Sequence, residues 1–216
     1  MIQTIFFDLD GTLTDSGPGI INSVSHALEK LKMPPLEDNN SWLVGPSLWD
    51  SFTKLGVPRE KLDVAISFYR ERYCAIGWAE NSCYPGILNQ LSKLHSDGYI
   101  LCLATSKPIY YAKKITGYFG IQEYLTHQFG SELDGTRSDK TELLKFGLIK
   151  SNSRCQSSLM VGDRKHDIIG AKNNLMRSIG ADYGYGEKGE LYLSGADQII
   201  LDPTKLYEVI KILEGK

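Results

Sequence analysis

Short apolar runs alternate with helix-length amphipathic stretches along most of the chain. The runs are rich in β-branched residues, whereas the stretches between them repeat apolar residues at helical spacing. Strands are predicted at residues 2–7, 99–104, 157–161, 178–181 and 198–201, with a weaker one at 127–129. Helices are predicted at residues 86–96, 109–119, 140–148, 168–174 and 204–213. This alternation favours a parallel sheet covered by helices on both faces.

One region, residues 17–82, interrupts the alternation. Its pattern predicts helices at 20–31, 42–55 and 60–76 and no convincing strand, with proline and glycine residues between them. A separate N-terminal helical domain would leave residues 2–7 as a strand without a sheet. An insertion after the first strand is the better interpretation. We therefore expect a three-layer α/β core at residues 1–15 and 84–216, and an all-helical inserted domain at 16–83.

Composition and charge restrict the class of protein. The chain has 216 residues, 42% of them hydrophobic and 23% charged, which is ordinary for a globular protein with a full core. The net charge of −2 gives no sign of a nucleic-acid surface. No apolar run is long enough for a membrane helix, and no secretory signal is recognisable. The cysteines show no C-x-x-C spacing. The simplest expectation is a cytoplasmic protein.

Two aspartates stand at the end of the first predicted strand, in the segment TIFFDLDGTLTDS. Asp8 and Asp10 follow an apolar run and precede Gly11. A carboxylate beside a hydrophobic strand end must be paired, protonated or bound to a metal. Two so close together would repel each other, so the chain has to supply positive charge near them.

Polar side chains also follow the other predicted strands. Because the carboxyl ends of parallel strands meet at one edge of a sheet, we expect these side chains to gather there. They are Asp8, Asp10, Thr105, Lys140, Asp163 and Asp167, and Ser106 and Lys107 follow Thr105 directly.

Each of these residues also has an ordinary structural explanation. Thr105 and Ser106 are suitable caps for the helix that follows, as is Asp163 for the next one. Lys140 taken alone would more often be a surface lysine, and Lys107 suits a solvated surface as well as a site. The combination is much harder to explain by chance than any single member, because every residue falls after a strand or at the start of a helix.

The motifs resemble those of the haloacid dehalogenase-like hydrolase superfamily over essentially the whole chain. The segment DLDGTLTDS is similar to its first motif, Thr105 to its second, Lys140 to its third and GDRKHD to its fourth. The resemblance implies a Rossmann-like core with a helical cap. The cap type and core length look most like the phosphoglycolate phosphatase-like branch, which includes nucleotidases and pyrophosphatases.

The resemblance implies a divalent cation, Mg²⁺, at the paired aspartates. Hard cations of this kind prefer oxygen ligands, and Asp8 and Asp163 can each offer a carboxylate. The superfamily pattern adds the backbone carbonyl of Asp10. Asp167 would orient Lys140 or a metal-bound water rather than bind the metal.

The same resemblance implies that Asp8 is a nucleophile that forms an aspartyl-phosphate. Asp10 would protonate the leaving oxygen and then activate water. Thr105, with Ser106 beside it, and Lys140 would bind the phosphate oxygens. Lys107 is a second candidate cation for the phosphate. Thr12 is expected to stabilise the tight turn.

Two details concern the reaction and the substrate. Asp10 argues against the dehalogenases, which lack a second acidic residue there. The third motif reads SDKTELL rather than the K-P-x-P common in the phosphoglycolate-like branch, which leaves the specific substrate open. The expected activity is a phosphomonoesterase acting on a small phosphorylated metabolite. The alternatives are a 5′-nucleotidase or pyrophosphatase and, less favoured, a phospholigand-binding protein without turnover.

Residues of the inserted domain would select the substrate. Gly45 and Pro46 resemble the branch's specificity loop, whose amides can meet an anion. Trp42 and Trp49 suit either a nucleobase stack or a helical core, and Arg70 and Arg72 either a carboxylate clamp or a solvated face. Residues 183–191 read as a loop bordering the site, with no chemical role assigned. A monomer or a homodimer is expected.

Overall fold

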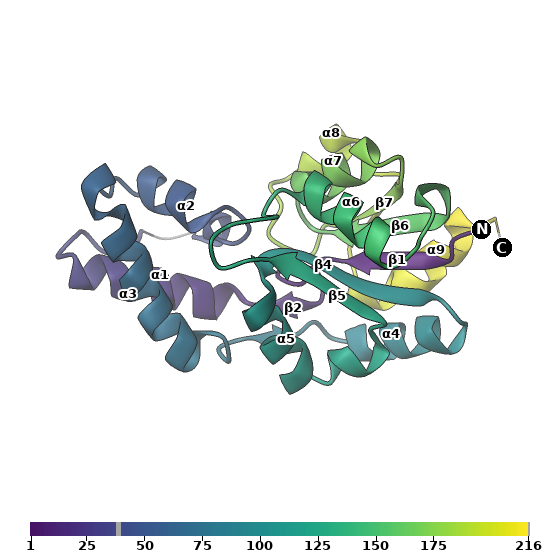
Figure 1. Cartoon of the computed structure of the whole chain (residues 1–216), viewed down its shortest axis with the longest axis horizontal. Helices are drawn as coiled ribbons and strands as arrows, with labels where there is room; N and C mark the ends of the chain where they lie inside the picture. The colour runs from purple at the N-terminus through teal and green to yellow at the C-terminus, as the bar shows by residue number, and fades with distance from the viewer. Residues whose placement is uncertain (38–39, 216) are drawn as a thin grey trace. The chain divides into compact units, whose positions relative to one another are not determined.

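The computed structural model describes residues 1–37 and 40–215. The described chain divides into two compact units (Figure 1). Unit 1 comprises Met1–Thr14 and Cys83–Lys216, and unit 2 comprises Asp15–Ser82. Unit 1 contains the large sheet, and unit 2 is built from helices. No helix in the described part of the chain has the length and apolarity that crossing a membrane requires.

Within the described residues, six parallel strands form the sheet of unit 1, in the order β5-β4-β1-β6-β7-β8. The strands are β1 (Thr4–Phe7), β4 (Ile100–Pro108), β5 (His127–Ser131), β6 (Ser158–Gly162), β7 (Arg177–Ala181) and β8 (Gln198–Ile200). Each corresponds to a predicted strand, and the α/β fold class is confirmed. The central strand β1 pairs with β4 on one side and β6 on the other.

Helices cover both faces of this sheet (Figure 1). One face carries α4 (Ile87–Ser96), α5 (Ile109–Tyr118) and α9 (Leu206–Leu213), and the other carries α6 (Lys140–Lys150), α7 (Lys165–Asn173) and α8 (Glu190–Ser194). Helix α4 shows why these segments fold as they do. Its buried residues Ile87, Leu91 and Leu94 recur at helical spacing and face the sheet, so one stripe is removed from water. Short 3₁₀ turns complete the layers: η4 (Ile121–Tyr124), η5 (Cys155–Ser157) and η6 (Pro203–Lys205).

Two short strands lie where the chain passes between the units. Strands β2 (Thr14–Asp15) and β3 (Ser82–Cys83) pair in a small separate sheet. Just inside unit 1, the amide of Tyr84 donates to the carbonyl of Leu13 at 3.2 Å. The sequence predicted no strand in residues 17–82, and Ser82 is an exception because it belongs to β3. A two-residue strand is too short to give a periodic signal.

Unit 2 contains α1 (Gly17–Lys30), η1 (Ser41–Leu43), α2 (Leu48–Lys54), η2 (Arg59–Lys61), α3 (Leu62–Arg72) and the π-helical turn η3 (Tyr73–Gly77). The single helix predicted at 42–55 is wrong. Gly45 has φ +110° and is followed by Pro46, so the backbone leaves the helical region between η1 and α2.

Candidate active site

A tight turn directly after β1 sets the first two aspartates. The amide of Asp8 donates to the carbonyl of Val161 at 2.9 Å, which extends the pairing with β6 to this residue. The carbonyl of Leu9 then accepts hydrogen bonds from the amides of residues 12, 13 and 14. Gly11 has φ +83°, a conformation that glycine adopts without the strain a side chain would bring. The turn therefore holds Asp8 and Asp10 at the carboxyl end of the central strand.

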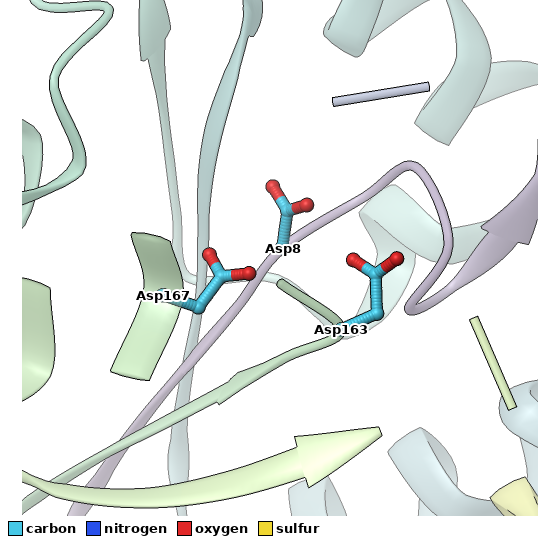
Figure 2. A group of neighbouring side chains, drawn as sticks. All are labelled: Asp8, Asp163 and Asp167. Carbon is cyan, nitrogen blue, oxygen red and sulfur yellow. The ribbon is translucent and has the colours of Figure 1, made fainter. Parts of the chain in front are cut away.

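Three buried carboxylates gather at this end of the sheet (Figure 2). Asp8 follows β1, Asp163 follows β6, and Asp167 projects from the first turn of α7. One carboxylate oxygen from each lies within 4.8 Å of the others. The sequence predicted that these residues meet, and the structure brings them together.

Lys140, the first residue of α6, supplies positive charge to this cluster. Its Nζ lies 2.9 Å from Asp8 Oδ1 and 2.7 Å from Asp167 Oδ1, and donates to the carbonyl of Ala104 at 2.9 Å. Burial alone would lower the pKa of Lys140, but Asp167 and Asp8 outweigh it and raise the pKa above its ordinary value. Lys140 therefore stays charged, and the alternative of a surface lysine does not hold because its side chain is buried.

One lysine does not neutralise three carboxylates. Burial raises the pKa of Asp8 from 3.8 to about 6, with Asp167 and Asp10 adding to the rise against the opposing effect of Lys140. The pKa of Asp163 lies well above 3.8, first because the residue is buried and then because Asp8 and Asp167 are close. Both pKa values are raised because ionised carboxylates are unfavourable when they are buried beside one another. A bound cation would stabilise their ionised forms.

Asp163 is enclosed by a loop after β7, residues 182–189. Its Oδ2 accepts a hydrogen bond from the amide of Tyr185 at 2.8 Å, and its Oδ1 lies 3.4 Å from the hydroxyl of Thr12. A Cβ at Gly184 would stand 2.4 Å from the Asp163 Cβ, and one at Gly11 would stand 2.1 Å from its Oδ2. Only residues without a side chain fit at these two positions.

Sequence reasoning gave this loop no role, although it orders Asp163. The hydroxyl of Tyr183 also donates to the Thr12 carbonyl at 2.9 Å, which joins the loop to the turn after β1. Glu190 binds the loop to the start of α7, since it accepts from Arg164 Nε at 3.0 Å and from the Lys165 amide at 2.6 Å. The sequence feature that could have indicated an ordered loop is the alternation of tyrosine and glycine at residues 183–186, shortly after a strand.

The sequence placed Thr105, Ser106 and Lys107 after a strand, but in the structure they lie inside β4. Thr105 is buried, and its Oγ1 accepts from the Lys107 amide at 3.2 Å. The Ser106 hydroxyl donates to the carbonyl of Ser138 at 2.8 Å, which joins β4 to the segment before α6. Lys107 does not lie free at the surface: its Nζ contacts both carboxylate oxygens of Asp10.

The remaining predicted residues belong to unit 2. Gly45 lies in the turn between η1 and α2. Arg72 binds the chain's own Glu80 through two contacts of 2.6 and 2.8 Å, so it holds an internal carboxylate. Trp49 is 40% exposed, which contradicts the interpretation of Trp49 as a core residue. The Cζ atom of Arg70 lies 6.0 Å from the centre of the Trp49 ring. Trp42 is partly buried beneath Lys54.

The residues present suit a divalent cation. Asp8 and Asp163 are hard oxygen donors in a buried, electron-rich site, and Asp167 is already engaged by Lys140 and by the Arg164 amide at 3.1 Å. A carboxylate beside a cation, with an ammonium group at 2.9 Å, can accept a phosphoryl group while the surrounding charges balance the phosphate oxygens.

Comparison with known proteins agrees with this chemistry. Residues 5–181 match the family model described as haloacid dehalogenase-like hydrolase. A 5′-nucleotidase of Pseudomonas aeruginosa is 37% identical over 209 residues, covering 96% of this chain and 95% of the relative. A phosphoglycolate phosphatase of Vibrio parahaemolyticus is 28% identical, with 98% and 97% covered. The crystal structure of a predicted phosphatase from Clostridium acetobutylicum superposes with a TM-score of 0.91 at 39% identity and covers 99% of each chain.

One similar protein carries a different name. The tyrosine-protein kinase PtkA of Mycobacterium tuberculosis is 38% identical over 185 residues, which cover 85% of this chain but 63% of PtkA. Members of the matched family generally use a divalent metal, which agrees with the acidic cluster. With the family model matched from β1 to β7 and the motif residues gathered at one sheet edge, the chain belongs to the haloacid dehalogenase-like hydrolases.

Proposed function

We propose that this protein is a Mg²⁺-dependent phosphomonoesterase that hydrolyses a small phosphorylated metabolite through an aspartyl-phosphate. The observation that carries the proposal is the arrangement around Asp8: a buried carboxylate with Lys140 Nζ at 2.9 Å and Asp163 within reach of a shared cation. The names of the phosphatase relatives support the reaction class.

In the first step an Asp8 oxygen attacks phosphorus, and the bond from phosphorus to the leaving oxygen breaks. Asp10, in its protonated form, gives that oxygen a proton, so an alcohol leaves. In the second step water attacks the aspartyl-phosphate and passes its proton to Asp10. The bond from phosphorus to Asp8 then breaks, which releases phosphate and restores the carboxylate.

Other side chains of unit 1 would hold the phosphoryl group during both steps. Lys140 neutralises its oxygens, Thr105 offers its hydroxyl, and Ser106 offers its backbone amide. Asp167 keeps Lys140 in place through the 2.7 Å ion pair. Asp8 and Asp163, with the backbone carbonyl of Asp10, would bind Mg²⁺. The bound ion supplies charge that balances the phosphate oxygens.

The substrate class has two candidates. Phosphoglycolate-type phosphatases and 5′-nucleotidases share the reaction but differ in the size of the leaving group. The relative named 5′-nucleotidase is 37% identical and the one named phosphoglycolate phosphatase 28%, and the exposed Trp49 beside Arg70 offers an aromatic face. These observations favour the nucleotidase alternative enough to test it first, with Gly45 expected to contribute to selection.

The test is phosphate release from nucleoside monophosphates, pyrophosphate and phosphoglycolate, with Mg²⁺ or with EDTA. Wild type should release phosphate only with Mg²⁺, and Asp8→Asn should lose at least about 1000-fold in kcat, because the amide is a far weaker nucleophile. Circular dichroism of the variant checks that its fold is retained. Wild-type rates in Asp8→Asn would overturn the mechanism. Tight phosphate binding without turnover would instead support the non-catalytic alternative.

A further inference from the structure

Tyr183 connects the two segments of unit 1 from which the proposed metal ligands come. It lies in the loop after β7, and its hydroxyl donates to the carbonyl of Thr12 at 2.9 Å. Thr12 belongs to the turn after β1, which carries the first two aspartates. The amide of Tyr185, two residues further along the loop, donates to Asp163 Oδ2 at 2.8 Å. One short loop therefore contacts both segments.

Thr12 is the residue at which the turn and the loop meet. Its side chain is fully buried, and its amide donates to the carbonyl of Leu9 at 3.2 Å within the turn. Its hydroxyl lies 3.4 Å from Asp163 Oδ1, beyond the usual range of about 2.5–3.0 Å for a hydrogen bond between two oxygens. The bond from the Tyr183 hydroxyl to the Thr12 carbonyl is shorter, so it is the firmer link between turn and loop.

Tyr84 and the strand beside the loop hold Tyr183 in place. The ring centres of Tyr84 and Tyr183 are 4.9 Å apart and the rings are inclined by 68°, a favourable edge-to-face arrangement. The Tyr84 amide in turn donates to the Leu13 carbonyl at 3.2 Å. At the base of the loop, the amide of Asp182 donates to the carbonyl of Ile200 in β8 at 2.9 Å. The Tyr183 hydroxyl is therefore presented by a ring and a backbone that are both held.

We propose that Tyr183 is a positioning residue that fixes the separation between the turn after β1 and Asp163, and so the dimensions of the cation site. The inference rests on the proposed function, in which Asp8, the Asp10 carbonyl and Asp163 would bind Mg²⁺. Mg²⁺ requires nearly ideal octahedral geometry with oxygens at about 2.0–2.1 Å, whereas Ca²⁺ accepts about six to eight oxygens at about 2.3–2.6 Å in flexible geometry. Ligands from two separate segments meet the stricter requirement only when the segments are held at a fixed separation.

The inference predicts a change in the choice of cation as well as in affinity. Without the Tyr183 hydroxyl, the turn and the loop can move apart slightly, which Mg²⁺ tolerates poorly and Ca²⁺ tolerates well. A residue that only supported the fold would weaken the binding of both ions to the same extent. The ratio of the two affinities therefore separates positioning from general stabilisation.

The experiment measures Mg²⁺ and Ca²⁺ affinities by calorimetric titration of wild type, Tyr183→Phe and Tyr84→Leu. Phenylalanine keeps the ring beside Tyr84 and removes only the hydroxyl, whereas leucine removes the aromatic neighbour that holds Tyr183. A matched control is Tyr207→Phe, because the Tyr207 hydroxyl also donates a hydrogen bond, at 2.7 Å, but to Asp97 before the start of β4. Circular dichroism checks that each variant retains its fold.

We expect Tyr183→Phe to weaken Mg²⁺ binding at least about tenfold and Ca²⁺ binding about twofold or less. Tyr84→Leu should shift the ratio of affinities in the same direction, and Tyr207→Phe should leave it unchanged.

Equal weakening of both ions in Tyr183→Phe, or an unchanged Mg²⁺ affinity, would overturn the inference alone. A wild type that binds neither ion would overturn the metal site of the proposed function as well. A wild type that binds Mg²⁺ and shows the expected change of ratio, but releases no phosphate, would support the inference and overturn the proposed function.

Discussion

Asp163 illustrates how a single residue can be costly to the fold and still suit the site. Its side chain is fully buried, and Asp8 and Asp167 stand close to it. A group whose pKa in the folded protein exceeds its unfolded value destabilises the fold as the pH rises above that unfolded value, because the unfolded chain then releases its proton more readily. Near neutral pH, the metal-free protein therefore bears a penalty that a bound cation would remove.

This penalty predicts opposite effects of one substitution under two conditions. In EDTA, Asp163→Asn should raise the free energy of unfolding by about 1–3 kcal/mol, because it removes an uncompensated buried charge. In Mg²⁺, wild type should gain stability by ligand binding, and the variant should gain much less. Urea unfolding at a pH of about 7 with EDTA or Mg²⁺ measures both effects.

Asp97→Asn is the control for that comparison. Asp97 also pairs with a lysine, Lys211, but it lies before the start of β4, whereas the cluster lies at the carboxyl ends of the strands. The Asp97→Asn protein should keep the response to Mg²⁺. An Asp163→Asn protein that is less stable than wild type in EDTA would show that the carboxylate is already compensated without metal.

The glycines around Asp163 give a second prediction. Gly184→Ala would place a methyl group 2.3 Å from the Gly11 carbonyl oxygen and 2.4 Å from the Asp163 Cβ, so the loop must move. We expect a loss of about 1–3 kcal/mol in stability and at least about tenfold weaker Mg²⁺ binding, measured by urea unfolding and by calorimetric titration.

Gly117→Ala provides the comparison for this substitution. Gly117 lies within α5, and its nearest neighbour is the flexible end of the Gln122 side chain at 3.2 Å. Alanine favours helix there, so its effect should be neutral or stabilising. Unchanged Mg²⁺ affinity in Gly184→Ala would show that the loop does not order Asp163 for the proposed metal binding.

For individual residues, the sequence predicted that Asp8, Lys140, Asp163 and Asp167 gather, because residues at the carboxyl ends of parallel strands share one edge of the sheet. It did not predict that Lys107 pairs with Asp10, since that contact follows a shift in the pairing of β4 with β5 between Thr105 and Pro108. The Tyr185 amide also escaped prediction, because a backbone donor has no signature in residue type.

The elements show a similar division. Long periodic segments such as α4 and α5 were predicted within a residue or two, because one apolar stripe specifies both helix and orientation. Helix α8 was missed, since it has only five residues between Gly189 and Gly195, too few for a period. Strand β4 continues to Pro108, whereas the apolar run ends at Ala104, because the residues that follow Ala104 lack the apolar pattern of a buried strand.

Helix α8 begins with a residue that holds two elements together. Glu190 accepts from Arg164 and from the Lys165 amide, so it fixes the loop after β7 to the start of α7. Burial alone would raise the pKa of Glu190, but the Lys165 amide and Arg164 outweigh it, and the pKa lies below its ordinary value of 4.5.

Its stabilising effect should therefore be complete above a pH of about 4.5 and should be lost as the pH falls through the lowered pKa. Glu190→Gln should cost about 1–3 kcal/mol near neutral pH. The difference from wild type should shrink in acid, which urea unfolding at a series of pH values measures. Glu208→Gln is the control, because Glu208 pairs with Lys205 while both side chains are more than half exposed. A difference that is constant with pH would contradict the assigned role of the charge.

Across the whole molecule, the division into two units follows from the order of the elements. Every strand of the large sheet lies in unit 1, and unit 2 is one continuous segment between β1 and α4. The chain leaves and re-enters unit 1 at neighbouring points, since Leu13 and Tyr84 share a backbone hydrogen bond of 3.2 Å. The sequence indicated this insertion because a helical pattern interrupted an α/β alternation.

Replacing Asp15–Ser82 by a short glycine–serine linker should therefore leave unit 1 folded. The shortened protein should retain helix and strand signals in circular dichroism, unfold cooperatively and bind Mg²⁺. We expect its preference among phosphoesters to weaken, because the residues proposed to select the substrate are gone. An aggregated or unfolded product would show that unit 1 depends on unit 2.

The strand pairing of β1 has a consequence for biosynthesis. Thr4 is registered with Ile100 on one side and with Ser158 on the other. The segment that carries Asp8 is therefore synthesised before both of its neighbours in the sheet, β4 and β6. Pairings this distant along the chain form slowly and leave an apolar strand without partners meanwhile. Asp8 is made before Lys140 and Asp163, so activity should be acquired only after β6 and α7 have been synthesised.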